Sequence, residues 1–372
     1  MNFDFSEDQK LLQKTVRDYL EEHSPLTAAR EVLEGPATYS PDLWKGAAEL
    51  GWLGATIPEE HGGAGFGHLE LCLIAEEVGR ALAPIPFSSS VYLATEAVLR
   101  LGNDAQQKAL LPGLANGEQI GSFALAEKPG TPTADSIQCA FRDGKLTGTK
   151  IAVADGEAAT FAVVAARGAE GVSLVIVDLD ANGVSRKSLD SFDGARPQAD
   201  LVFDGAPAEL LGRAGQGFEQ AESLLDRAAV LMAFEQVGAA ERAFDITKEF
   251  TLDRYAFGRP VASFQAVKHR LADLWCAIEL ARSNSYYGAW ALSGDEPELA
   301  VAAPGARVAA TDALELAAEE MLQLHGGVGF TWEYDCHLFY RRSKFLGLTL
   351  GSARDWRDKL VRRLAAQQAQ QA

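Results

Sequence analysis

Cysteine is scarce in this sequence, and long hydrophobic runs are absent. The chain of 372 residues has four cysteines, and none of them belongs to a Cys-x-x-Cys pair: Cys72, Cys139, Cys276 and Cys336. This scattering is typical of reduced thiols and argues against a disulfide framework or a zinc site. No apolar run approaches the roughly 18 residues of a candidate membrane span, and the N-terminus is charged from Asp4 onward, without an apolar signal core. We therefore expect a soluble, cytoplasmic protein with no membrane span and no metal site.

Positive charge is also in short supply. The chain has 34 Lys and Arg against 52 Asp and Glu, which gives a formal net charge of −18. This excess argues against nucleic acid and anionic membranes as partners, because both carry negative charge. A small anionic ligand is still compatible with it, since a local pair of arginines can oppose the overall field. The chain is long enough to bury a large core in two or three domains.

The spacing of apolar residues divides the chain into a helical, a strand-rich and a second helical segment. In residues 1–117, Ser6 followed by Gln9 predicts a capping box at the first helix, and Ser40 before Pro41 predicts the start of another helix. From about residue 118 the period falls towards two, and the pair Asp143-Gly144 predicts a hairpin turn. The expected strands are residues 122–126, 136–141, 145–150, 160–164, 172–177 and 200–203.

After residue 214 the chain returns to long helical patterns. The expected helices are residues 217–257, 260–292, 306–325 and 335–366. Their length and their one-sided apolar stripes predict an up-and-down four-helix bundle. The fold class is therefore α+β: an N-terminal helical domain (1–117), a middle antiparallel β-barrel or sandwich (118–213) and a C-terminal four-helix bundle (214–372).

Residues 254–269 separate the first two helices of the predicted bundle. Gly258 and Pro260 mark the break, and the first turn of the following helix has unpaired backbone N–H groups that suit an anion. Arg254 and Arg259 flank this break, and arginine is the side chain best suited to grip a phosphate with two hydrogen bonds. The alternative is an ordinary helix–turn–helix corner with solvated arginines.

Three sequence blocks together resemble one family. The first is the Arg-x-x-Phe-Gly-x-Pro pattern from Arg254, followed by Phe-Gln and Lys-His. The second is the Gln-x-x-Gly-Gly-x-Gly-Phe pattern in residues 323–334, and the third is the Ile-Pro-Glu-Glu-His-Gly-Gly loop of residues 57–63. Their order and spacing resemble those of the acyl-CoA dehydrogenase family over nearly the whole chain.

The resemblance implies an FAD site shared between subunits. In this family the first two blocks reach across a subunit interface and hold the pyrophosphate and adenosine of a flavin in the neighbouring subunit. The residues that it assigns here to cofactor binding are Arg254, Phe257, Phe264, Gln265, Gln323, Leu324, His325, Gly326 and Gly327. Glycines let the backbone approach the cofactor, and arginine opposes the pyrophosphate charge. We interpret His269 and His325 as structural rather than catalytic.

The catalytic base of the family is missing from its usual places. The glutamate that removes the substrate α-proton in most members corresponds to Leu350, and the alternative position used by some relatives corresponds to Ala228. The nearby carboxylates are Glu222, Asp226 and Glu235, each of which would need a shifted register or backbone to act. They are equally compatible with a solvated face or a buried ion pair. We therefore assign no catalytic residue.

The middle segment also departs from the family pattern. Residues 126–134 begin with Ala126 where the family has the threonine of Thr-Glu-Pro-Gly, and residues 150–155 stand where it has Trp-Ile-Thr. The hydroxyl and indole that would hold the isoalloxazine ring are thus missing from their usual places. This departure puts flavin binding by the lone chain in doubt.

The resemblance implies oxidation of an acyl-CoA between its α and β carbons. It leads us to expect one subunit of a hetero-oligomeric enzyme, with a second acyl-CoA dehydrogenase-like subunit as partner and an electron-transfer flavoprotein as the electron acceptor. Residues 331–338 resemble a variant found in bacterial relatives that act on bulky acyl-CoA esters, including steroid side chains. Two alternatives stay open: a self-sufficient homotetramer with a relocated carboxylate, and a non-catalytic scaffold without flavin.

Overall fold

The computed structural model describes residues 5–371, which fall into two compact units. Within the described residues, the helical unit comprises 5–31, 68–83 and 229–371, and the sheet unit comprises Val32–Gly67 and Pro84–Ala228. No helix within the described part of the chain is long and apolar enough to cross a membrane.

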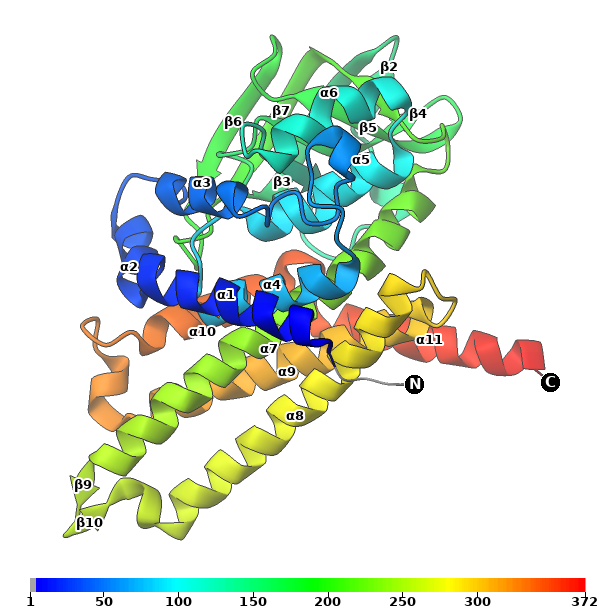
Figure 1. Ribbon diagram of the computed structural model, residues 1–372. Helices are drawn as coiled ribbons and strands as arrows, with labels where there is room; N and C mark the ends of the chain where they lie inside the picture. Colours follow the sequence, from blue (N-terminus) through cyan, green and yellow to red (C-terminus); the bar gives the residue numbers. More distant parts are fainter. Residues whose placement is uncertain (1–4, 372) are drawn as a thin grey trace. The chain divides into compact units, whose positions relative to one another are not determined.

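The helical unit is built on long helices joined by short connections. Figure 1 shows α7, α8 and α9 running alongside one another, with the hairpin β9–β10 joining α7 to α8 at one end. Its elements are α1 (Glu7–His23), the start of α2 (Leu26–Glu34), α4 (His68–Arg80), α7 (Gly217–Asp253) from residue 229 onward, β9 (Tyr255–Ala256), β10 (Arg259–Pro260), η4 (Val261–Ser263), α8 (Gln265–Ser293), α9 (Leu299–Leu324), η5 (Gly326–Phe330), α10 (Cys336–Thr349) and α11 (Ala353–Gln371).

Local capping signals set several helix boundaries. The capping box predicted for the first helix is present, because Ser6 and Gln9 exchange hydrogen bonds between side chain and backbone. The last predicted helix is instead two helices, α10 and α11. Gly351 breaks it with a left-handed backbone (φ 100°), and Ser352 and Asp355 then form a new cap. A serine followed three residues later by an acid was the sequence signal for this break.

Two glycines bring α4 and α7 into backbone contact. A Cβ on Gly79 would lie 1.8 Å from the carbonyl oxygen of Glu235, and a Cβ on Gly238 would lie 1.8 Å from that of Glu76. Each helix therefore needs a glycine where it crosses the other, since no larger residue fits between the two backbones. This crossing fixes α7, the helix that leads to the hairpin.

Buried ion pairs surround the same crossing. Glu76 and Glu77 on α4 are both buried; Arg282 of α8 donates to Glu76, and Arg17 of α1 lies 2.7 Å from Glu77. Burial raises the pKa of Glu76, although the guanidinium of Arg282 opposes the shift. Arg80 extends the network by pairing with Asp245 on α7 at 3.0 Å. Four helices of the unit thus share one charged cluster.

The sheet unit packs helices against a mixed eight-stranded sheet. The strand order is β6-β7-β3-β2-β4-β5-β8, with β1 paired to β4. The core of the unit includes Val163, Leu174, Leu111 and Leu114, which come from strands and from α6. Its elements are the end of α2, α3 (Pro41–Glu49), η1 (Glu59–His61), η2 (Ser88–Thr95), α5 (Glu96–Leu101), α6 (Asp104–Ala115), β1 (Gly121–Ala124), η3 (Ala134–Ser136), β2 (Ala140–Arg142), β3 (Lys145–Ala154), β4 (Phe161–Gly168), β5 (Gly171–Asp178), β6 (Val184–Leu189), β7 (Gln198–Pro207), β8 (Glu209–Leu211) and the start of α7.

The predicted α+β class is confirmed, with differences in the sheet. The hairpin at Asp143-Gly144 is present between β2 and β3, and both turn residues have positive φ, 50° and 71°. Strands β6 and β8 were missed, and they lie at the two ends of the strand order, so the sheet does not close into a barrel. Strand β4 pairs in parallel with β1 and β2, whereas the other pairings are antiparallel. The predicted boundaries at residues 117 and 213 fall between α6 and β1 and between β8 and α7; the division into three domains stays a prediction.

Candidate functional site

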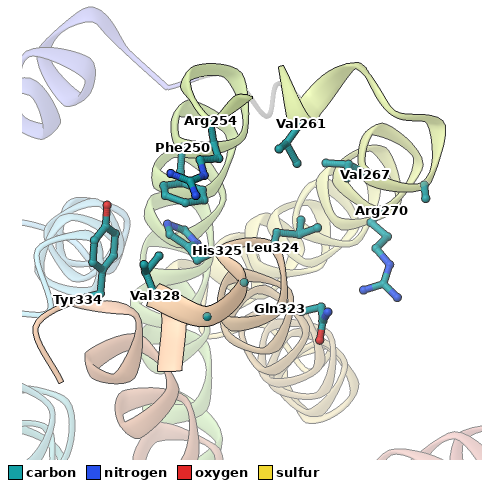
Figure 2. Close-up of a pocket in the computed structure, with 13 residues that line it drawn as sticks. Phe250, Arg254, Val261, Val267, Arg270, Gln323, Leu324, His325, Val328 and Tyr334 are labelled. Carbon is teal, nitrogen blue, oxygen red and sulfur yellow. The ribbon is translucent and has the colours of Figure 1, made fainter. Parts of the chain in front are cut away.

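A pocket of about 720 Å³ lies in the helical unit where α7, α8 and α9 end or begin (Figure 2). Six of the predicted cofactor residues line it, and they come from both sequence blocks: Arg254, Gln323, Leu324, His325, Gly326 and Gly327. Seven further residues complete the wall: Phe250, Val261, Ala266, Val267, Arg270, Val328 and Tyr334. The fold thus joins segments that are some seventy residues apart in the sequence.

The hairpin between α7 and α8 holds Arg254 at the pocket. The backbone N–H of Arg254 donates to the carbonyl of Phe250 at the end of α7, and its carbonyl accepts from Val261 at 2.7 Å. Phe257 and Gly258 turn the chain with positive φ of 54° and 77°. The helices on either side of this break, α7 and α8, therefore end earlier and begin later than predicted, because the hairpin and η4 occupy residues 255–263.

Three of the predicted cofactor residues lie outside the pocket wall. Phe257 is 96% exposed at the hairpin tip, and its ring centroid is 6.2 Å from that of Phe264. The guanidinium of Arg259 lies 3.9 Å from the Phe264 ring, a cation–π contact that stiffens the hairpin. Gln265 begins α8 and is exposed. Their assignment to cofactor binding stays a prediction.

Arg254 gives the pocket a positive charge. Arg270, the second arginine of the wall, pairs with Glu320 on α9 at 3.1 Å. Within residues 5–371 the exposed guanidinium of Arg254 has no carboxylate partner. The pocket can therefore attract an anion although the chain as a whole has a net charge of −18.

Glycines open the floor of the pocket. Gly326 has φ 63°, which favours glycine through its conformation, and no other atom lies within 4 Å of the Cβ positions of Gly326 and Gly327. Gly329 differs, since its Cβ would lie 2.6 Å from the carbonyl oxygen of Leu322. The fold of this chain thus requires glycine at 329, whereas open space surrounds the Cβ position of Gly327. Such space suits a ligand that approaches the backbone closely.

Aromatic rings form one side of the pocket. His325 stacks on Phe250 with ring centroids 4.2 Å apart, and Tyr334 meets both rings edge-on. Arg30 of α2 fixes the loop that contains Tyr334, because its guanidinium donates to the carbonyl of Trp332 at 2.7 Å and to Asp335 at 2.6 Å. No sequence pattern marks these contributions of Arg30 and Phe250, which depend on packing between distant segments.

None of the candidate bases lines this pocket. Glu222 is exposed, whereas Asp226 is 6% exposed and belongs, like Glu222, to the sheet unit. Glu235 is fully buried in the helical unit, and its charge stabilises the guanidinium of Arg307. Burial nevertheless lowers the pKa of Arg307 to about 9. Glu235 is thus buried and does not belong to a solvated face.

Leu350 occupies the break between α10 and α11. It is 7% exposed, and its carbonyl accepts a hydrogen bond from the indole of Trp356 at 3.1 Å. The side chain is a hydrocarbon and cannot accept a proton. The residue that the resemblance matches to the family's base is thus a packed apolar residue.

In the sheet unit, Ala126 and Ala152 lie in the two segments that the resemblance matches to the family's flavin-ring contacts. The backbone carbonyl of Ala126 accepts a hydrogen bond from the N–H of Ile151. Ala152, which follows Ile151 in the sequence, has φ 49° at a bulge of β3. The neighbouring Lys150 is buried and donates to the carbonyl of Leu125 at 3.0 Å and to Glu127 at 2.7 Å. These residues offer no side-chain hydroxyl and no indole to a flavin.

Comparison with known proteins identifies the family. The model of the acyl-CoA dehydrogenase N-terminal domain matches residues 6–118, and that of the acyl-CoA dehydrogenase C-terminal domain matches residues 215–365. The acyl-CoA dehydrogenase IpdE2 of Mycolicibacterium smegmatis is 32% identical over 97% of this chain and 99% of its own length. The chain belongs to the acyl-CoA dehydrogenase family.

Two solved structures whose names each contain two components are similar to this chain. A variant of the Tcur3481-Tcur3483 steroid ACAD has a TM-score of 0.89 and 31% identity, covering 98% of this chain and 99% of that one. The ChsE4-ChsE5 complex from Mycobacterium tuberculosis has a TM-score of 0.88 and 27% identity, with 98% and 99% coverage. Both similarities extend over nearly the whole chain.

Members of the family are FAD-dependent oxidoreductases, so FAD is the cofactor that the family implies. The pocket of the helical unit fits the pyrophosphate and adenosine part of FAD, because it combines open glycines, aromatic rings and a guanidinium that no carboxylate of the described residues pairs with. The sheet unit fits the ring part less well, because Ala126 and Ala152 replace the usual contacts. The two units thus differ in the side chains that they offer to a flavin.

Proposed function

We propose that this chain is one subunit of a hetero-oligomeric acyl-CoA dehydrogenase and completes the flavin site of a partner. Its pocket holds the pyrophosphate and adenosine of an FAD whose ring lies in the partner subunit. The partner supplies the catalytic base, and the complex desaturates a bulky acyl-CoA between its α and β carbons. The supporting observation is the contrast between the pocket around Arg254 and the leucine at position 350.

Each pocket residue has a definite task in this proposal. The guanidinium of Arg254 neutralises pyrophosphate charge, and Gln323 offers an amide to the ligand. Gly326 and Gly327 let the ligand approach the backbone closely. When bound, FAD supplies the acceptor for the substrate's β-hydride, while position and electrostatics come from the protein.

The names of the two structural relatives favour a hetero-oligomer and a bulky substrate. One is a steroid ACAD named for two chains, and the other is a complex of two chains. Both aligned chains match this one over nearly its whole length. Residues 331–338 resemble a variant found in relatives that act on bulky acyl-CoA esters, and this resemblance favours the same class of substrate.

The direct test is flavin content with and without a partner. The chain is purified alone and together with a candidate acyl-CoA dehydrogenase-like partner subunit, and visible absorbance is recorded for both samples. We expect flavin absorbance and dehydrogenase activity in the complex and neither in the lone chain. Stoichiometric FAD with turnover in the lone chain would defeat the proposal.

The substitution Arg254→Ala tests the role of the pocket. Removing the charge that opposes the pyrophosphate should lower FAD retention by the assembled complex at least tenfold, which is about 1.4 kcal/mol. Arg259→Ala is the matched control, because Arg259 lies on the same hairpin but outside the pocket wall. Unchanged FAD retention in Arg254→Ala would favour the scaffold alternative.

The homotetramer alternative makes a different prediction. One of Glu222, Asp226 and Glu235 would then be the base, and its replacement by the matching amide would abolish turnover. We expect unchanged activity of the complex for Glu222→Gln and Asp226→Asn. A loss of activity with Glu235→Gln is to be judged against its folding, because Glu235 stabilises the buried Arg307.

A further inference from the structure

The helix η2 of the sheet unit differs in its hydrogen bonding from the α-helices around it. It is a π-helix of eight residues, Ser88–Thr95. In a π-helix each backbone N–H bonds to the carbonyl five residues earlier rather than four, and such turns are rare and occur frequently at functional sites. Every side chain of the segment is buried, with at most 4% exposed. The surrounding residues therefore have to hold the segment in a form that helices seldom adopt.

A buried ion pair holds the first turn of η2. Arg196 and Asp155 lie 2.7 Å apart, and their side chains are 1% and 2% exposed. The guanidinium of Arg196 donates to the hydroxyl of Ser88 at 2.8 Å. The hydroxyl of Ser89 donates to the carboxylate of Asp155 at 2.5 Å. Two consecutive residues of the helix are thus bonded to the two members of this first ion pair, which fixes the rotation of the first turn.

The backbone of Asp155 indicates that its carboxylate is needed at this place. Its φ of 53° is in the left-handed region, which glycine adopts most easily. Its N–H donates to the carbonyl of Pro197 at 3.0 Å, and its carbonyl accepts from Ala159 at 3.0 Å, so the turn is fixed. A glycine would suit this backbone better, but it would remove the carboxylate with which Arg196 pairs.

A second buried ion pair follows the end of η2. Glu96, the first residue of α5, accepts from the guanidinium of Arg227 near the start of α7, and both side chains are at most 4% exposed. The π-helix therefore connects two buried ion pairs. Because each hydrogen-bonded turn of a π-helix contains one residue more than that of an α-helix, rewinding η2 as an α-helix would rotate Glu96 away from Arg227.

We propose that η2 is a conformational device with two registers. In the π register the first ion pair holds the hydroxyls of Ser88 and Ser89, and the second pair is closed. In the α register these hydroxyls leave the first pair, and the second pair opens. Fixing a register is the best-attested use of a buried ion pair, since such a pair contributes little net stability.

The device connects two segments that the resemblance relates to the flavin chemistry. Asp155 ends residues 150–155, which the resemblance matches to flavin-ring contacts, and Arg227 directly precedes Ala228, which it matches to the alternative position of the base. A shift of residues 150–155 therefore reaches the start of α7 through η2, within the sheet unit. This inference does not rest on the proposed function, because both ion pairs belong to this chain.

Hydrogen exchange of the purified full chain tests the hold on the first turn. The double variant Ser88→Ala with Ser89→Ala removes both hydroxyls. Ser173→Ala is the control, because its buried hydroxyl accepts from Gly215 at 3.0 Å and from neither ion pair. We expect the amides of residues 88–96 to exchange at least tenfold faster in the double variant, as the loss of two neutral hydrogen bonds implies, and at the natural rate in the control. Unchanged exchange in the double variant, or equal acceleration in the control, overturns the inference.

A crystal structure of Asp155→Asn tests the two registers directly. Asparagine keeps the size of the side chain and tolerates the left-handed backbone, but it removes the charge with which Arg196 pairs. We expect α-helical hydrogen bonds across residues 88–95 and a separation of Glu96 from Arg227. A π-helix with the second ion pair still closed refutes the two registers, even where the variant is less stable. The proposed function is unaffected by that result, since the flavin content of the complex tests it separately.

Discussion

At the scale of single residues, the pocket and the missing base carry the functional argument. Arg254, Gln323 and Gly327 could be assigned from the sequence because the family motifs contain them. The partners of His325 could not, since its stacking on Phe250 depends on how α7 and α9 pack. Likewise, the sequence showed that Leu350 is not a base, but only the structure shows that it lies at a helix break.

His325 should also make the stability of the protein depend on pH. Burial lowers its pKa in the folded chain below the ordinary value of about 6.5. As the pH falls below that value, the unfolded chain binds a proton that the folded chain does not, so folding loses stability. His325→Phe should remove this contribution.

Chemical denaturation of the natural chain and of His325→Phe between pH 7.5 and about 5.5 measures this effect. The range spans the pKa of about 6.5 that histidine has in the unfolded chain. The difference in unfolding free energy between the natural chain and the variant should be constant near pH 7.5. Towards pH of about 5.5 the natural chain should lose stability relative to the variant. A difference that does not change with pH would show that the ring titrates as it does in the unfolded chain.

At the scale of elements, the crossing of α4 and α7 determines where the pocket-bearing end of α7 lies. We expect Gly238→Ala to lower the unfolding free energy by about 3 kcal/mol, because its Cβ would lie 1.8 Å from a backbone oxygen and the helices would have to separate. Gly305→Ala in α9 is the control. Its nearest neighbour would be 3.8 Å away, so the change should be neutral or stabilising by up to about 1 kcal/mol.

Thermal and urea unfolding of the two variants provides the measurement. Equal stability of Gly238→Ala and Gly305→Ala would show that α4 and α7 can separate without loss of unfolding free energy. The predicted rigidity of this crossing would then be wrong.

Elements with strong local signals were the easiest to predict. Ser6 with Gln9 and Asp143 with Gly144 define their helix start and hairpin through residues a few positions apart. The missed strand β6 is mostly polar and partly exposed, so it has no apolar alternation to reveal it. The α4–α7 crossing joins Gly79 to a residue far along the chain, and no local pattern marks such a contact.

At the scale of the whole molecule, the net charge limits which ligands the chain attracts, and the proposed half-site would limit what it does by itself. A net charge of −18 is compatible with an anionic cofactor only where a local arginine opposes it, as Arg254 does. Sequence patterns predicted the α+β class, and they also predicted that an arginine pair including Arg254 could oppose the net negative charge locally. They could not show whether a second chain completes the site, since that depends on the partner's residues.

The proposed division of labour predicts a flavin count. If this chain contributes only the pyrophosphate and adenosine side, the assembled complex should contain half as many flavins as polypeptides. If each chain instead holds a ring of its own, flavins and polypeptides should be equal in number. The ratio follows from the flavin absorbance of the purified complex together with its mass measured by light scattering or native mass spectrometry.

Arg254→Ala in this chain should then remove essentially all flavin from the complex. The matching arginine substitution in the partner should leave the flavin in place, because that arginine would face the sheet unit of this chain, in which Ala126 and Ala152 offer no ring contacts. Equal losses from the two substitutions would mean that both subunits hold flavin, and the one-sided assignment of the site would have to be abandoned.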